Sequence, residues 1–221
     1  MKKKARQREL WFVNWGGRRR GAGRKPKGER AGVSHAKRAK LAARFPVLVT
    51  MRLRAGLRSL RADDTHALLK EAFAAGSHER FRVIEFSVQS NHVHMVAESS
   101  DERALARGMM GLSTRIARGL NRLWRRVGNV FPDRYHSRIL QTPRAVRTAL
   151  IYVLQNARKH GAWRALVPDV YSSAPWFEGW KGIHEVAESN PRILPRARTW
   201  LLSIGWRRHG LIDPRETPVA A

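Results

Sequence analysis

Residues 81–98 read FRVIEFSVQSNHVHMVAE and contain the clearest structural signal in the chain. Apolar and polar residues alternate over Phe81–Val88 and again over His92–Glu98, which is the period-two pattern of β-strands. The residues between them, QSN at 89–91, are typical of a turn. The stretch therefore predicts two neighbouring antiparallel strands joined by a short turn.

The segments on either side of this stretch complete a recognisable order of elements. Two more strands are predicted at Pro46–Leu53 and Tyr135–Gln141. Helical patterns occupy Thr65–His78 (with Asp63 or Asp64 as its cap), Asp101–Val127, and Pro143 to about Lys159. The order β-α-β-β-α-β-α begins as the ferredoxin-like split β-α-β arrangement does. We therefore expect an α+β fold, a ferredoxin-like or RRM-like antiparallel sheet with its helices packed on one face.

Positive charge dominates the composition and is concentrated near the N-terminus. The chain has 44 Lys and Arg against 17 Asp and Glu, a net charge of +27. Residues 1–44 hold 16 of these cations and only two Glu, and their Gly-rich run at 16–28 has no regular pattern. A polyanion such as nucleic acid is the expected partner. We expect a flexible basic arm at 1–44, a folded domain at 45–160 and a Trp- and Pro-rich C-terminal extension at 161–221.

Several classes of protein are disfavoured by the composition. The absence of cysteine excludes disulfides, thiolate zinc sites and cysteine nucleophiles. The longest plainly apolar run, Ala149–Leu154, is too short to span a bilayer, and no apolar core follows the basic first residues as in a signal peptide. We expect a cytoplasmic, nucleoid-associated protein with no membrane partner.

The sequence His92-Val93-His94 is the sharpest chemical feature. On a strand, residues i and i+2 point to the same face, about 6.5–7 Å apart along the chain. Two imidazoles so placed can bind one divalent metal ion. The alternative is two unrelated polar side chains on a solvated sheet face.

Tyr152 and Asn156 lie four residues apart in the last predicted helix. If this helix continues through both, their side chains share one face. Asn156 could then offer its oxygen to a metal ion, and Tyr152 could act as a covalent nucleophile on a phosphate. The alternatives are a core aromatic residue and a polar residue at a helix end. Tyr135, on a predicted strand, is a rival nucleophile.

Four motifs, in this order along the chain, resemble one family of DNA-processing enzymes. SNHVHMV at 90–96 resembles the His-hydrophobic-His strand of the single-tyrosine HUH transposases, and YVLQN at 152–156 resembles their nucleophile helix. VFPDRYHS at 130–137 and YSS at 171–173 resemble segments of the REP-associated tyrosine transposases, a subgroup of that family. The resemblance covers residues 45–175 or thereabouts.

This resemblance implies a metal-dependent DNA strand transferase whose catalytic domain is residues 45–160. Such enzymes cleave and rejoin single-stranded, hairpin-flanked DNA through a covalent 5′-phosphotyrosine, which here would form on Tyr152. The implied ligands of Mg²⁺ or Mn²⁺ are His92, His94 and Asn156. The chain departs from the family where Ala157 follows the helix asparagine, because the family usually has proline there.

Basic side chains in the arm and around the predicted site are expected to contact DNA phosphates. They are Arg18, Arg19, Arg20, Arg24, Lys25, Arg134, Arg138, Arg158 and Lys159. A merely solvated basic surface is the alternative for each. Trp124 and Trp163 are candidates for stacking on unpaired bases. The expected partner is single-stranded DNA that forms a hairpin, and a homodimer is a further option.

Two other functions stay open. A non-catalytic nucleic-acid-binding protein could use the same RRM-like fold, but His92 and His94 occupy the strand where such modules carry aromatic residues. A metal-dependent hydrolase that activates water would keep both histidines and survive loss of the Tyr152 hydroxyl.

Overall fold

The computed structural model describes residues 39–159, 168–182 and 192–218, apart from the Lys159 side chain, and all of them belong to one unit at 35–221. The secondary-structure elements follow the order predicted from the sequence. They are β1 (Val47–Arg52), α1 (Asp63–Gly76), β2 (Phe81–Val88), β3 (His92–Ser99), α2 (Glu102–Leu123), β4 (His136–Ile139), α3 (Pro143–Leu154), α4 (Asn156–Lys159), η1 (Ala174–Trp176), α5 (Trp200–Ser203) and η2 (Gly205–His209).

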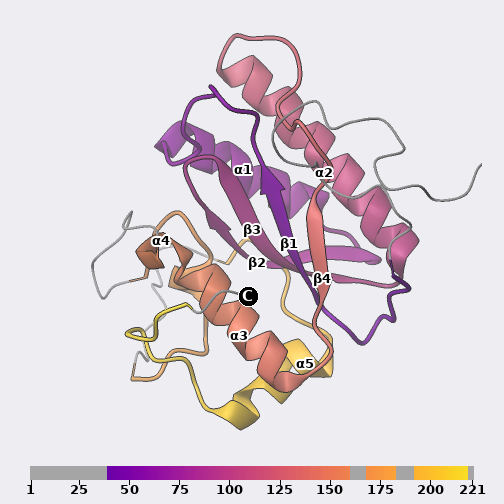
Figure 1. The fold of residues 1–221 in the computed structure, drawn as a ribbon, viewed down its shortest axis with the longest axis vertical. Coiled ribbons are helices and arrows are strands. Elements are labelled where there is room, and N and C mark those ends of the chain that lie inside the picture. Colours follow the sequence, from indigo (N-terminus) through magenta and orange to yellow (C-terminus); the bar gives the residue numbers. More distant parts are fainter. Residues whose placement is uncertain (1–38, 160–167, 183–191, 219–221) are drawn as a thin grey trace, which may run out of the picture. The chain divides into compact units, whose positions relative to one another are not determined.

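The four strands form one antiparallel sheet in the order β2-β3-β1-β4 (Figure 1). β1 lies between β3 and β4, so that Thr50 is opposite His94 on one side and His136 on the other. Helix α1 links β1 to β2, and α2 links β3 to β4, which is the split β-α-β arrangement. The expected α+β class with an antiparallel sheet is confirmed.

Helices α1 and α2 cover one face of the sheet through a large apolar cluster. Met95 of β3 and Phe86 of β2 are fully buried there with Phe73 of α1. Gly108 allows α2 to approach the sheet closely, because a Cβ at this position would lie 2.2 Å from Cγ of Phe81. This face supplies most of the large buried side chains that stabilise the domain.

Helix α3 covers the opposite face, so the expectation that the helices pack on one face is correct for α1 and α2 and wrong for α3 (Figure 1). Leu48 and Val96 of the sheet are buried with Leu150 of α3, and Trp206 from the C-terminal segment completes this second cluster. The reason is that Leu48, Ile84 and Val96 place apolar side chains on this face as well. The sheet therefore needs cover on both sides.

The last predicted helix is interrupted. α3 ends at Leu154, Gln155 leaves the helical conformation (φ −114°, ψ 13°), and α4 is a separate turn that begins at Asn156. The Gln155 side-chain amide donates to the carbonyl of Asp213 at 3.0 Å. The helix break is thus accompanied by a contact with the C-terminal segment. The periodicity of the local sequence does not indicate such a contact.

Two helix ends also differ from expectation. Asp63 and Asp64 lie inside the first turn of α1, where the cap is Ala62 and makes no side-chain hydrogen bond. α2 stops at Leu123 instead of Val127, because Arg125 adopts a positive φ of 49° that a helix does not tolerate. In the part of the chain that the structure describes, no helix is both long and apolar enough to cross a membrane.

Candidate active site

His92 and His94 lie side by side on the face of the sheet that α3 covers. Their ring centroids are 4.7 Å apart, with the rings edge to face. Val93 and Met95 alternate with them and are buried in the cluster under α1 and α2. The strand alternation therefore separates two polar side chains from two core side chains.

A hydrogen bond at Nδ1 holds each imidazole. Oγ1 of Thr50 lies 2.9 Å from Nδ1 of His94, and Oδ1 of Asn91 lies 2.8 Å from Nδ1 of His92. An Nδ1–H that donates to an oxygen leaves the lone pair on Nε2, which is the pattern of histidines that bind metal ions. Thr50 was missed by the sequence analysis. The feature of the sequence that could have indicated Thr50 is a polar residue between apolar neighbours in the strand predicted at 46–53.

Tyr152 approaches the same histidine from α3. Its hydroxyl lies 3.4 Å from Nε2 of His94, and the two ring centroids are 4.8 Å apart. Helix α3 starts at the cap Thr142, whose side chain accepts from the N–H of Ala145. Its apolar residues fix it on the sheet, so that the half-buried Tyr152 is held beside the histidine pair.

Tyr135, the rival nucleophile, lies elsewhere. It precedes β4 and packs against the apolar cluster under α1 and α2, on the face opposite to His94. Trp124, a candidate for base stacking, packs partly buried against the same cluster. Neither ring belongs to the constellation of Tyr152 and the two histidines.

Asn156 does not continue the helix face of Tyr152, because the break at Gln155 separates them. Its side chain is fully buried, and among the described residues its amide oxygen and nitrogen have no hydrogen-bond partner. A buried amide without a partner costs about 1–3 kcal/mol. An uncommitted buried oxygen is what a hard metal ion accepts as a ligand.

Two imidazoles, those of His92 and His94, lie together beside Tyr152 and are the expected ligands of a divalent metal ion. In the described residues, no group of three His, Cys, Asp or Glu could hold a metal ion. The adjacent rings of His92 and His94 are thus the part of the expected ligand set that the fold brings together, and the buried, unpartnered amide of Asn156 lies beyond the break at Gln155.

The predicted DNA-contacting residues fall into four groups. Arg134 and Arg138 are exposed, and Arg138 is opposite Leu48 on the face that α3 covers. The guanidinium of Arg158 donates to the carbonyl of Pro214 and to Oε1 of Gln155, so it is held by the protein itself. Lys159 ends α4. Outside the described residues are Arg18, Arg19, Arg20, Arg24, Lys25 and Trp163.

Arg52 is a further cation near the site and is not among the residues predicted from the sequence. It is exposed and opposite His92 in the β1–β3 register, so it shares the sheet face of the histidines. His136 is exposed on the same face, opposite Thr50. The surroundings of the histidine pair are thus polar and basic on the side of β1 and β4.

The fold is similar to that of a solved transposase. The structure of a REP-associated tyrosine transposase bound to a REP hairpin matches with a TM-score of 0.54 and 15% sequence identity, over 76% of this chain and 93% of that chain. At this identity the similarity concerns the fold. No protein-family model and no curated protein sequence matches the chain.

Proposed function

We propose that this protein is a transposase-type DNA strand transferase that cleaves and rejoins single-stranded DNA through Tyr152. The observation that carries the proposal is the 3.4 Å approach of the Tyr152 hydroxyl to Nε2 of His94, with the His92 ring beside it. The fold similarity to a transposase bound to a DNA hairpin and the net charge of +27 support it. A hairpin-forming single strand is the proposed substrate.

The proposed reaction is a transesterification. The phenolic oxygen of Tyr152 attacks a phosphorus atom of the DNA backbone, and the bond from that phosphorus to the 3′ oxygen breaks. The phenol loses its proton and the leaving oxygen gains one, which yields a 5′-phosphotyrosine and a free 3′-hydroxyl. Attack by a 3′-hydroxyl on the phosphotyrosine reverses these bond changes and rejoins a strand, so no nucleotide cofactor is required.

The residues around Tyr152 have separate roles in this proposal. His92, His94 and Asn156 would hold Mg²⁺ or Mn²⁺, which polarises the scissile phosphate and stabilises the developing negative charge. Thr50 and Asn91 orient the imidazoles through Nδ1. The guanidinium groups of Arg52 and Arg138 are proposed to bind the flanking phosphates.

The test compares wild type with Tyr152→Phe on labelled hairpin DNA taken from beside the gene. The reactions contain Mg²⁺ or Mn²⁺, with and without EDTA, and are resolved on a denaturing gel. We expect a metal-dependent protein–DNA adduct in wild type and none in Tyr152→Phe, because the phenylalanine lacks the attacking oxygen, while DNA binding is retained. Tyr135→Phe is the matched control and keeps the adduct.

Other outcomes would replace the proposal. An adduct that persists in Tyr152→Phe and disappears in Tyr135→Phe moves the nucleophile to Tyr135. Cleavage without an adduct in both Tyr152→Phe and wild type indicates a hydrolase that uses water. Binding without cleavage by the wild-type protein indicates a non-catalytic nucleic-acid-binding module.

A further inference from the structure

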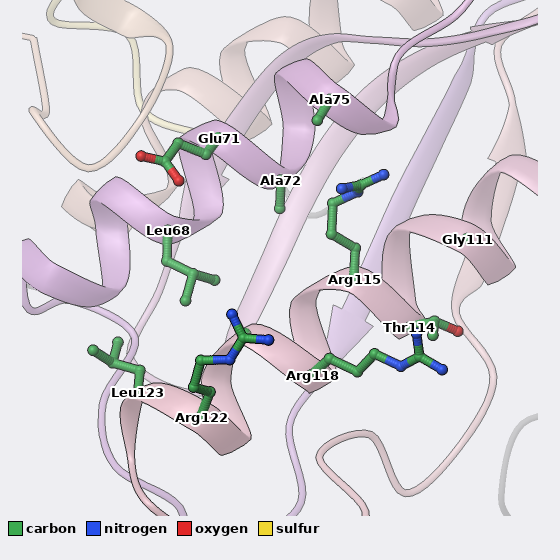
Figure 2. A pocket seen from close by; sticks show the side chains of 11 residues that line it. Leu68, Glu71, Ala72, Ala75, Gly111, Thr114, Arg115, Arg118, Arg122 and Leu123 are labelled. Carbon is green, nitrogen blue, oxygen red and sulfur yellow. The ribbon is translucent and has the colours of Figure 1, made fainter.

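A groove of about 750 Å³ runs between the outer sides of α1 and α2. The two helices are antiparallel there, because Leu68 lies beside Gly119 and Gly76 lies beside Leu112. Small and aliphatic side chains form its walls, and three arginines of α2 line it (Figure 2). These helices cover the face of the sheet opposite to Tyr152, so the groove is separate from the candidate active site.

The three arginines, Arg115, Arg118 and Arg122, form a row on one side of α2. All three are exposed, and none forms an ion pair within the described residues. Figure 2 shows Arg115 and Arg122 reaching into the space between the helices, whereas the carboxylate of Glu71, the only acid lining the groove, points away from them. The groove therefore presents an excess of positive charge, three arginines against one glutamate.

The spacing of this row suits a nucleic-acid backbone. At 1.5 Å per residue the row spans about 10 Å along the helix, which is about three base-pair steps of 3.4 Å. Arginine binds phosphate through two parallel hydrogen bonds. None of the residues that line the groove is aromatic, so it offers unpaired bases no stacking surface.

We propose that the groove between α1 and α2 binds the phosphate backbone of duplex DNA. This inference rests on the proposed function and deepens it: the tyrosine side of the sheet takes the single strand, and the arginine side takes a paired segment. The contacts are to phosphates, so this second site does not read base sequence. It increases the affinity of the enzyme for substrates that contain a stem.

The test measures the affinity of the full chain for a 20-base-pair duplex of arbitrary sequence at several salt concentrations. The groove variant is Arg118→Gln/Arg122→Gln, and the control is Arg103→Gln/Arg107→Gln, which removes the same charge from exposed positions of α2 outside the groove. We expect the groove variant to bind about tenfold more weakly, with a slope of log affinity against log salt reduced by about 2. Equal affinity and slope in the two variants would overturn the proposal.

A second variant, Ala75→Glu, keeps every arginine and places a carboxylate in the groove. Ala75 is exposed on α1, and Figure 2 shows it across from Arg115. We expect weaker duplex binding here too, and unchanged binding would overturn the proposal. Adduct formation on hairpin DNA distinguishes failure of one proposal from failure of the other. If wild type forms the adduct but the groove variants bind duplex DNA normally, only the duplex site is refuted. If the groove variants bind duplex DNA more weakly but wild type forms no adduct, only the proposed function is refuted.

Discussion

The two faces of the sheet bury different kinds of side chains. Under α1 and α2 the strands contribute Met95, Phe86 and other apolar residues to one continuous cluster. Under α3 a polar row crosses the sheet instead, formed in register by Ser87, His94, Thr50 and His136. Two acids are also buried on this face, and each has an arginine partner: Glu98 pairs with Arg82, and Glu85 with Arg192.

This difference indicates that one face mainly stabilises the domain, whereas the other carries the polar groups of the candidate site. Apolar burial stabilises by about 25 cal/mol per Å², whereas buried polar groups need partners to avoid a cost. Burial raises the pKa of Glu85, and the neighbouring Arg192 opposes that shift. The face under α3 therefore carries the candidate reactive groups, and the larger apolar cluster under α1 and α2 contributes much of the burial that keeps them in place.

The largest effect on stability is expected at the centre of the apolar face. Phe73 is fully buried and its ring centroid lies 4.8 Å from that of Phe86. Phe73→Ala should lower the free energy of unfolding by about 3–5 kcal/mol, because it removes buried surface and leaves a cavity. Urea denaturation measures this, with Phe73→Leu as a milder variant. Tyr152→Phe, on the other face, should change the stability by less than about 1 kcal/mol. Similar losses of unfolding free energy in Phe73→Ala and Tyr152→Phe would contradict the proposed difference between the two faces.

An intermediate effect, on activity alone, is expected at Thr50. Thr50→Val keeps the shape of the side chain and removes the hydroxyl at Nδ1 of His94. Loss of a residue that orients a metal-binding histidine typically costs about 10–100-fold in metal affinity or activity. The rate of adduct formation, titrated against Mn²⁺, measures the loss, and Thr50→Ser should restore most of it. A Thr50→Val protein with wild-type rates would show that the polar row does not serve the reaction.

An effect that appears only at acid pH is expected from His66. This α1 residue packs against Phe86 and Tyr171, and burial, with a smaller contribution from Lys70, lowers its pKa from 6.5 to about 4. The unfolded chain therefore binds more protons between pH 4 and 6.5, so stability is complete above pH 6.5 and declines as the pH falls toward 4. The melting temperature should fall less over this range in His66→Gln than in wild type. His78→Gln, at an exposed histidine, is the control. A melting temperature that falls equally steeply with decreasing pH in His66→Gln and in wild type would contradict the assignment.

The strands were predictable because their signal is local. Phe81–Val88 and the start of β3 at His92 match the alternation in the sequence, which also separates His92 and His94 from Val93 and Met95. Helix ends were less predictable. The stop of α2 at Leu123 depends on the backbone of Arg125, and no composition signal marks that position.

The arrangement of the candidate site was predictable only in part. The sequence singled out Tyr152 and the two histidines, but the role of Thr50 requires the β1–β3 register, which places it opposite His94. The helix face that Tyr152 and Asn156 were expected to share is lost through the break at Gln155. The arginines of α2 contribute to the positive charge seen in the sequence, but the groove that they line forms only because α1 packs beside α2.

Local patterns were enough to predict the order of the elements, the alternation of His92 and His94 with core residues, and the excess positive charge. These properties follow from a periodicity of two or 3.6 residues and from composition, which act over short distances along the chain. The tertiary structure was needed to show that Tyr152 meets His94, 58 residues away, and that α3 covers the face opposite to α1 and α2. Contacts of this kind depend on strand register and on helix packing, and both are set by the burial of apolar surface across the whole domain.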